Sequence, residues 1–190
     1  MNDAYPPIER AEWRRLSEPE HAEVWERFYE KFDYRPEGGL TRLAIKEPVP
    51  SVTFDLRGCE EGGEFAAAVE AIESEALRSF VDALADVEAL FVLDYNHPSF
   101  EVRFREERRE RWPVGLWSPM PGVYPDGDYY AYLTPDFTEG TFGSPTEPSL
   151  CVFGPRLVGS LAMALSDWLP IKRVDGDASG VLHTEGLRGT

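Results

Sequence analysis

Apolar side chains recur at helical spacing in three stretches of the chain. The first opens with Ser17-Glu18-Pro19-Glu20, where the serine hydroxyl and the second glutamate can satisfy the free amides of a first helical turn. The longest stretch carries apolar side chains three or four positions apart, with polar side chains on its other side. The third follows Gly154-Pro155 and stops at Pro170. The pattern therefore predicts helices over about residues 17–32, 64–86 and 155–169.

Alternating apolar and polar side chains indicate strands between these helices. Val52, Phe54 and Leu56 share one side of such a segment, and Leu90 to Leu93 form a dense apolar run typical of a central strand. The glycines of residues 137–143 favour a turn and a close approach of the backbone. We expect strands over about residues 51–56, 89–95, 99–104, 128–133 and 150–153, and a short one at 40–45.

The order of these elements defines the fold class. Consecutive strands without helical crossovers favour antiparallel pairing, and helices outside the run of strands favour an α+β fold. We expect a mainly antiparallel sheet of about five to seven strands, with three helices packed on one face. The single domain is predicted to span residues 12–174, between a flexible N-terminus over 1–11 and a flexible tail over 175–190.

Composition places the chain among soluble globular proteins. It has 190 residues, 42% of them hydrophobic, which is enough apolar material for an ordered core. No apolar run approaches the roughly 18 residues of a membrane span, and Met1 to Arg10 does not resemble a signal peptide. Cys59 and Cys151 match no metal-binding spacing and are expected to be free thiols. These features predict a cytoplasmic protein.

The charge balance limits the classes of partner that the protein is expected to bind. Acidic residues outnumber basic residues by 35 to 19, for a net charge of −16. A surface of this sign repels nucleic-acid phosphates and anionic lipids, so neither nucleic acid nor membrane is expected to bind. It favours a protein partner with a basic surface, although ordinary solubility explains the charge as well. The oligomeric state stays open.

Few residues offer chemistry. The three histidines are isolated in sequence, and Asp126 with Asp128 offers too few oxygens for a metal, so we expect a hairpin turn there and neither metal nor cofactor. No catalytic nucleophile is indicated, because Cys151 lies in an apolar strand. The best acid–base pair is Asp94 with His97, and capping of a hairpin by His97 is the competing interpretation.

Aromatic side chains with polar tips gather around residues 112–132. Such residues suit recognition of a protein or a small molecule, and they equally suit a sheet face packed under a loop. The segment also contains the carboxylates of Asp126 and Asp128. The candidate binding surface comprises Trp112, Trp117, Tyr124, Asp126, Asp128, Tyr130, Ser144 and Glu147.

Four motifs in order identify a family resemblance from about Trp25 to Leu169. The motifs are Glu-Pro-x-Pro-Ser-x-Thr at 47–53, Leu-Asp-aromatic-x-His at 93–97, Tyr-Pro-Asp-Gly-Asp-Tyr at 124–129, and Gly-Thr-Phe-Gly-His-Pro-Trp-Glu followed by Cys-Val-Phe-Gly over 140–154. They resemble the bacterial family of domain of unknown function 2716. The chain has Ser144 and Thr146 where the family pattern has histidine and tryptophan. The resemblance implies no activity, and any chemistry of that histidine is lost here.

These observations favour a non-catalytic binding or protein-interaction module. One version is an immunity-type inhibitor that neutralises a basic toxin, which the acidic charge suggests. The alternative is a small-molecule enzyme that uses Asp94 and His97 with Asp126 and Asp128 near the sheet edge.

Overall fold

The computed structural model describes residues 12–36, 43–60, 65–105 and 122–178. Within them, eight strands form one sheet in which every neighbouring pair is antiparallel. The spatial order is β1-β4-β3-β5-β6-β7-β2-β8. The strands are β1 (Trp13–Arg15), β2 (Ser51–Asp55), β3 (Leu90–Asp94), β4 (Phe100–Val102), β5 (Tyr130–Leu133), β6 (Gly140–Ser144), β7 (Ser149–Phe153) and β8 (Ile171–Val174). The predicted α+β class with an antiparallel sheet is confirmed.

The helices match the three apolar stripes of the sequence. The elements are α1 (Glu18–Phe32), α2 (Arg57–Glu60), α3 (Phe65–Ala83), and α4 (Pro155–Leu157), which continues through a π-helical turn (Val158–Ala162) into α5 (Met163–Ser166). The capping box at the start of α1 is present, and the Ser17 amide donates to Glu20 Oε2 over 2.8 Å. Pro155 lies in the first turn of α4, where its missing N–H leaves no hydrogen bond unmade.

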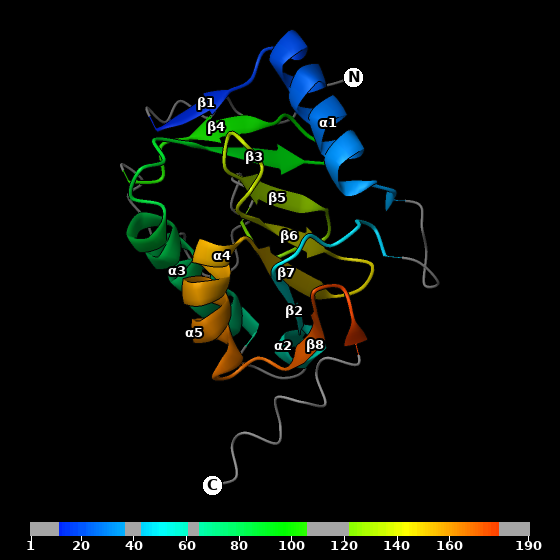
Figure 1. Ribbon diagram of the computed structural model, residues 1–190, viewed down its shortest axis with the longest axis vertical. Helices are drawn as coiled ribbons and strands as arrows, with labels where there is room; N and C mark the ends of the chain where they lie inside the picture. The colour runs from blue at the N-terminus through cyan, green and yellow to red at the C-terminus, as the bar shows by residue number, and fades with distance from the viewer. Residues whose placement is uncertain (1–11, 37–42, 61–64, 106–121, 179–190) are drawn as a thin grey trace, which may run out of the picture.

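The helices cover both faces of the sheet, so the expectation of helices on one face is wrong. Figure 1 shows α1 on one side, and α3 with α4 and α5 on the other. Each side has its own core, because strand side chains alternate between the faces. Phe28 of α1 packs with Leu93 and Phe142 on one side. Phe80 of α3 packs with Val92 and Val152 on the other.

The sheet is also larger than the alternation pattern indicates. Residues 140–144, read as a turn, form the central strand β6, in which a Cβ added at Gly140 would lie 2.3 Å from the Tyr132 carbonyl oxygen. The predicted close approach of the backbone is therefore real, but it lies within a strand. The expected strand at 40–45 lies partly outside the described residues, and residues 43–45 are not in a strand. Edge strands β1 and β8 were not predicted.

Some of the other sequence-based expectations concern residues outside the described ranges. Both termini lie largely outside them, as do Trp112 and Trp117. Cys59 and Cys151 are buried and are not joined by a disulfide. No helix in the described part of the chain is long and apolar enough to cross a membrane.

Candidate functional site

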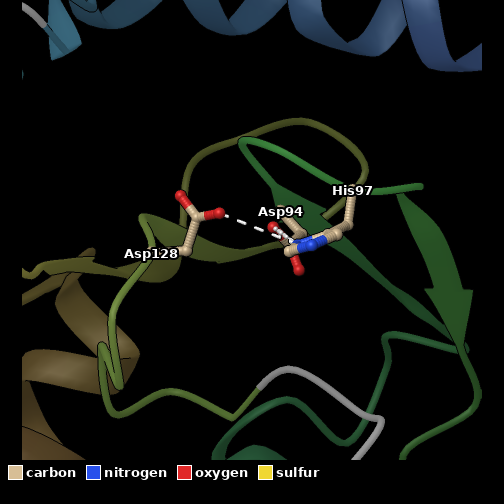
Figure 2. A group of neighbouring side chains, drawn as sticks. All are labelled: Asp94, His97 and Asp128. Carbon is tan, nitrogen blue, oxygen red and sulfur yellow. Dashed lines mark hydrogen bonds and ion pairs between the residues drawn. The ribbon is translucent and has the colours of Figure 1, made fainter. Parts of the chain in front are cut away.

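Three ionisable side chains come together where the neighbouring interior strands β3 and β5 meet, at the end of β3 and the start of β5. Asp94 is the last residue of β3, and it pairs across the sheet with Tyr130 at the start of β5. Asp128 lies two residues before that start, and the turn after β3 returns His97 to the same place. Figure 2 shows the three side chains pointing toward one another. We call Asp94, His97 and Asp128 the Asp–His cluster.

The distances in the Asp–His cluster are those of direct contact. His97 Nδ1 lies 2.9 Å from Asp94 Oδ1 and 3.7 Å from Asp128 Oδ2. Neighbouring groups fix Asp128, because Asn96 Nδ2 donates to its Oδ2 over 2.7 Å and the Tyr129 amide donates to its Oδ1 over 2.8 Å. The structure therefore places beside His97 the carboxylate of Asp94, with which the sequence analysis paired it, and that of Asp128 from a distant segment.

The Asp–His cluster is negatively charged and poorly solvated. The Asp94 and Asp128 side chains are 7% and 8% exposed, whereas that of His97 is 31% exposed. Burial raises the pKa of Asp94 to about 6, against the lowering effect of its hydrogen bond to His97. Among the described residues, no lysine or arginine forms an ion pair with either carboxylate. The cluster can therefore exchange a proton or accept a cation.

Asp126 does not join this cluster. Its side chain is exposed, and the Tyr130 hydroxyl donates a hydrogen bond to its Oδ1 over 2.7 Å. The enzyme hypothesis named Asp126 and Asp128 as carboxylates that could act with Asp94 and His97, and the structure brings only Asp128 to that pair.

The tyrosines of the candidate binding surface are core residues. Tyr124 and Tyr130 are buried, which agrees with the interpretation of core packing. Ser144 is buried at the end of β6, and Glu147 is partly buried in the turn that follows. Within the described residues, the carboxylate of Asp126 is therefore the most exposed part of that surface.

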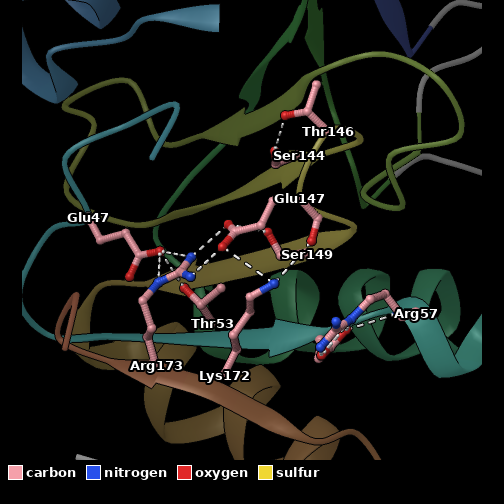
Figure 3. Close-up of polar contacts among 10 residues, drawn as sticks. Glu47, Thr53, Arg57, Ser144, Thr146, Glu147, Ser149, Lys172 and Arg173 are labelled. Atoms are coloured by element: carbon pink, nitrogen blue, oxygen red, sulfur yellow. Dashed lines mark hydrogen bonds and ion pairs between the residues drawn. The ribbon is translucent and has the colours of Figure 1, made fainter. Parts of the chain in front are cut away.

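Glu147 belongs to a second polar cluster, centred on Arg173 of β8. The Arg173 guanidinium lies between two carboxylates, with Nη2 2.6 Å from Glu47 Oε1 and Nη1 2.5 Å from Glu147 Oε1. Thr53 also donates to Glu47 Oε1, over 2.9 Å, and Lys172 Nζ lies 3.4 Å from Glu147 Oε1. Figure 3 shows the Arg173 side chain between those of Glu47 and Glu147, with Thr53 and Lys172 beside them. Its opposite charges neutralise one another, which is the pattern of a structural network.

Tyr129 connects the surroundings of the two clusters. Its amide holds Asp128, and its hydroxyl lies 2.8 Å from Thr146 Oγ1. Ser144 Oγ lies 3.4 Å from the same atom. Of the two positions where the family pattern has histidine and tryptophan, Thr146 therefore contacts Tyr129 and Ser144 contacts Thr146, and both hold small hydroxyl side chains here.

The outer face of α1 is a third feature, and the interpretation of the sequence did not single it out. It carries four exposed glutamates that form no ion pair among the described residues: Glu18, Glu23, Glu26 and Glu30. Tyr29 lies on the same helix and is 43% exposed. Tyr95 at the adjacent sheet edge is 37% exposed, and both rings pack against Trp25. We call these six residues the acidic α1 face.

The basic residues of α1 turn away from this face. Arg27 Nη2 donates to the Pro135 carbonyl oxygen over 2.7 Å, and its guanidinium lies 4.4 Å from the centre of the Phe137 ring. Lys31 Nζ donates to the Asp136 carbonyl oxygen over 3.2 Å. Both cations are used to hold the turn after β5. The helical spacing of Glu23, Glu26 and Glu30 could have revealed the acidic face from the sequence alone.

The fold and its clusters define a class of α+β protein in which four sequence motifs meet in pairs. The motifs at 93–97 and 124–129 supply the Asp–His cluster, and those at 47–53 and 140–154 supply the carboxylates around Arg173. The chain belongs to the family described as protein of unknown function (DUF2716), whose sequence model matches residues 15–158.

A curated relative matches most of the chain. The chain is 24% identical over 153 residues to the uncharacterized protein YxiI of Bacillus subtilis (strain 168), covering 78% of this chain and 91% of the relative. No solved structure matches the chain significantly.

Proposed function

We propose that the protein is a non-catalytic protein-interaction module that binds a partner with a basic surface on the acidic α1 face. The observation that carries the proposal is the separation of charge on α1. Arg27 and Lys31 bind carbonyl groups of the 135–137 turn, while the glutamates of the outer face have no counter-ion among the described residues. The acidic α1 face therefore presents negative charge to solvent, while the exposed Lys31 is engaged with the Asp136 carbonyl oxygen.

A basic partner would relieve repulsion within this face. Glu23, Glu26 and Glu30 are three and four residues apart, and like charges at these spacings destabilise a helix by about 0.2–0.5 kcal/mol per pair. Lysine or arginine side chains placed between them would replace repulsion with attraction. The exposed rings of Tyr29 and Tyr95 add the aromatic contacts that are enriched at protein interfaces.

The net charge of −16 supports the same partner class. It raises the rate of encounter with a basic protein and disfavours nucleic acid. An immunity-type inhibitor of a basic toxin is the narrower form of this proposal, and a cytoplasmic location is part of it.

Affinity capture from a native lysate of the source organism tests the proposal. Three baits are compared: the wild-type chain, a variant with Glu23→Gln, Glu26→Gln and Glu30→Gln, and a matched control with Glu70→Gln, Asp82→Asn and Asp167→Asn. Each variant removes three exposed negative charges, and the control removes them from α3 and the end of α5.

The expected result is a basic protein that the wild type and the control retain and the α1 variant loses by at least tenfold. Crosslinking before capture preserves a weak complex. Equal retention by all three baits, or no specific protein in any of them, contradicts the proposal.

The second candidate is a small-molecule enzyme, favoured by the 2.9 Å contact between His97 and Asp94. A carboxylate can orient an imidazole that takes up or releases a proton, and the exposed side of His97 leaves access from solvent. A hollow of about 510 Å³ lies at the other end of β3, beside Glu88 and Thr134, and none of the enzyme candidates lines it. Because this hollow lies away from Asp94 and His97, protein interaction is the first proposal and catalysis the second.

Turnover of chromogenic esters, phosphoesters and glycosides tests the second candidate. It predicts an activity that Asp94→Asn and His97→Gln abolish and that Asp126→Asn retains. Turnover that survives both cluster substitutions would assign the activity elsewhere or to a contaminant.

A further inference from the structure

The Asp–His cluster has the ligand spacing of a metal site. The nitrogen of His97 and one oxygen of each aspartate all lie within 4.8 Å of one another. A divalent ion about 2.0–2.2 Å from each ligand atom places adjacent ligand atoms roughly 3–3.5 Å apart. The observed separations of 2.9 Å and 3.7 Å from His97 Nδ1 bracket that range. Shifts of a few tenths of an ångström would bring both separations from His97 into that range, and a bound ion would draw together the two aspartate oxygens, which lie within 4.8 Å of each other.

Regular structure holds two of the three ligands in place. Asp94 ends β3, and Asp128 stands just before β5, with β3 and β5 hydrogen-bonded to each other. Asn96 and the Tyr129 amide fix the Asp128 carboxylate from opposite oxygens. Hydrogen bonds of this kind orient metal ligands and contribute strongly to affinity.

The surroundings of the cluster also favour a cation. Two side chains that are more than nine-tenths buried carry the carboxylates, and within the described residues no basic side chain other than His97 pairs with them. Two carboxylates this close repel each other, and a bound cation relieves that repulsion. The exposed side of His97 gives an ion a way in and leaves room for water as a further ligand.

The ligand set selects the kind of ion. Calcium and magnesium prefer oxygen ligands alone, whereas one imidazole with two carboxylates suits first-row transition metals. Of these, Zn²⁺ accepts three protein ligands with water in the remaining position.

We propose that Asp94, His97 and Asp128 bind one divalent first-row transition metal ion of the Zn²⁺ class. This departs from the expectation of no metal, and it uses no residue of the acidic α1 face.

Metal titration of the full chain, freed of metal with a chelator, tests the site. Binding of Zn²⁺ is measured by calorimetry, and Co²⁺ is added separately because its visible absorption bands report nitrogen and oxygen ligation. One equivalent of each ion is expected to bind. Asp94→Asn, His97→Gln and Asp128→Asn should each weaken Zn²⁺ binding by at least about tenfold.

Two controls separate this site from weak binding elsewhere. His21→Gln removes a histidine outside the cluster, and Asp126→Asn removes the neighbouring carboxylate; both variants should bind as the wild type does. Circular dichroism of each metal-free variant shows that it is folded. The proposal is overturned if no ion binds, or if the cluster substitutions change affinity no more than the controls do.

The same titration distinguishes the two proposals. The variant Glu23→Gln, Glu26→Gln, Glu30→Gln is expected to bind Zn²⁺ normally while it fails to capture a basic partner. A failed metal titration would leave the capture result unchanged.

Discussion

Substitution of Arg173 gives the most direct prediction of a change in folding stability, because its side chain is a nearly buried cation between two carboxylates. Its side chain is 9% exposed, and that of Glu47 is 3% exposed. Arg173→Met keeps most of the side-chain volume and removes the charge. Glu47 then stays in the interior without that partner, and the hydroxyl of Thr53 still donates to it.

The expected loss of stability is large. Removing one partner of a buried ion pair costs about 3–5 kcal/mol, because an uncompensated charge remains. Glu47→Gln is expected to cost less, about 1–3 kcal/mol, since Arg173 keeps its contacts with Glu147. The double substitution removes the buried charge together with its partner, so it should cost at least about 1 kcal/mol less than the two single losses combined.

The pH dependence provides an internal check through Glu147. Burial raises the pKa of Glu147, but the hydrogen bonds and charge of Arg173 outweigh burial and hold the pKa below its usual value. A lowered pKa stabilises the fold above the unfolded-state pKa of about 4.3, and the stabilisation is lost as pH falls through the folded-state pKa. The difference in stability between wild type and Arg173→Met should therefore shrink between pH 7 and pH 3.5.

Urea unfolding followed by tryptophan fluorescence measures these free energies. The reasoning fails if Arg173→Met costs less than about 1 kcal/mol at pH 7, the size of an ordinary substitution. It also fails if the double substitution costs as much as the two single ones combined.

Three further predictions concern local structure, each measured as a urea-unfolding free energy. Gly154→Ala should cost about 2–4 kcal/mol, because φ is +90° and the new Cβ would lie 2.3 Å from Glu139 Oε2; an unchanged midpoint would contradict the close contact. Ser17→Ala should cost about 1 kcal/mol by removing half of the capping box with Glu20, and no loss would mean that the box is not formed in solution. Phe28→Ala should cost about 3–5 kcal/mol, since Phe28 is fully buried between α1 and the sheet; a loss below about 1 kcal/mol would mean that α1 is not docked.

The pattern of apolar residues predicted the elements whose periodicity is regular. The stripes of α1 and α3 and the alternation around Phe54 and Phe100 were sufficient, because in these segments apolar side chains gather on one side and polar side chains on the other. Strand β6 was not predicted from this pattern. Its Gly140 and Gly143 have no side chains to alternate, and the reason for glycine lies in backbone and side-chain atoms of other segments.

The candidate sites show a similar division. The pair of Asp94 and His97 could be proposed from the sequence because three positions separate the two residues. Asp128 could not be added, since its approach depends on the pairing of β3 with β5. The contact of Glu47 with Arg173 joins residues 126 positions apart and depends on β8, which the sequence did not indicate.

The placement of helices on two faces of the sheet could not be predicted for the same reason, because it depends on contacts between distant segments. Apolar stripes show that α1 and α3 each bury one side, but the stripes do not say which face of the sheet receives them. The assignment follows from the strand register, in which Leu93 faces α1 and Val92 faces α3.

The central claim is that the acidic α1 face binds a partner with a basic surface, and carboxylate-to-lysine crosslinking tests it most directly. A zero-length carbodiimide reagent joins carboxylates to lysine amines in a native lysate, and mass spectrometry identifies the carboxylates that reacted with another protein. The account predicts that crosslinks to a basic partner concentrate on Glu23, Glu26 and Glu30. Crosslinks distributed evenly over the exposed carboxylates, or concentrated on α3, would contradict it.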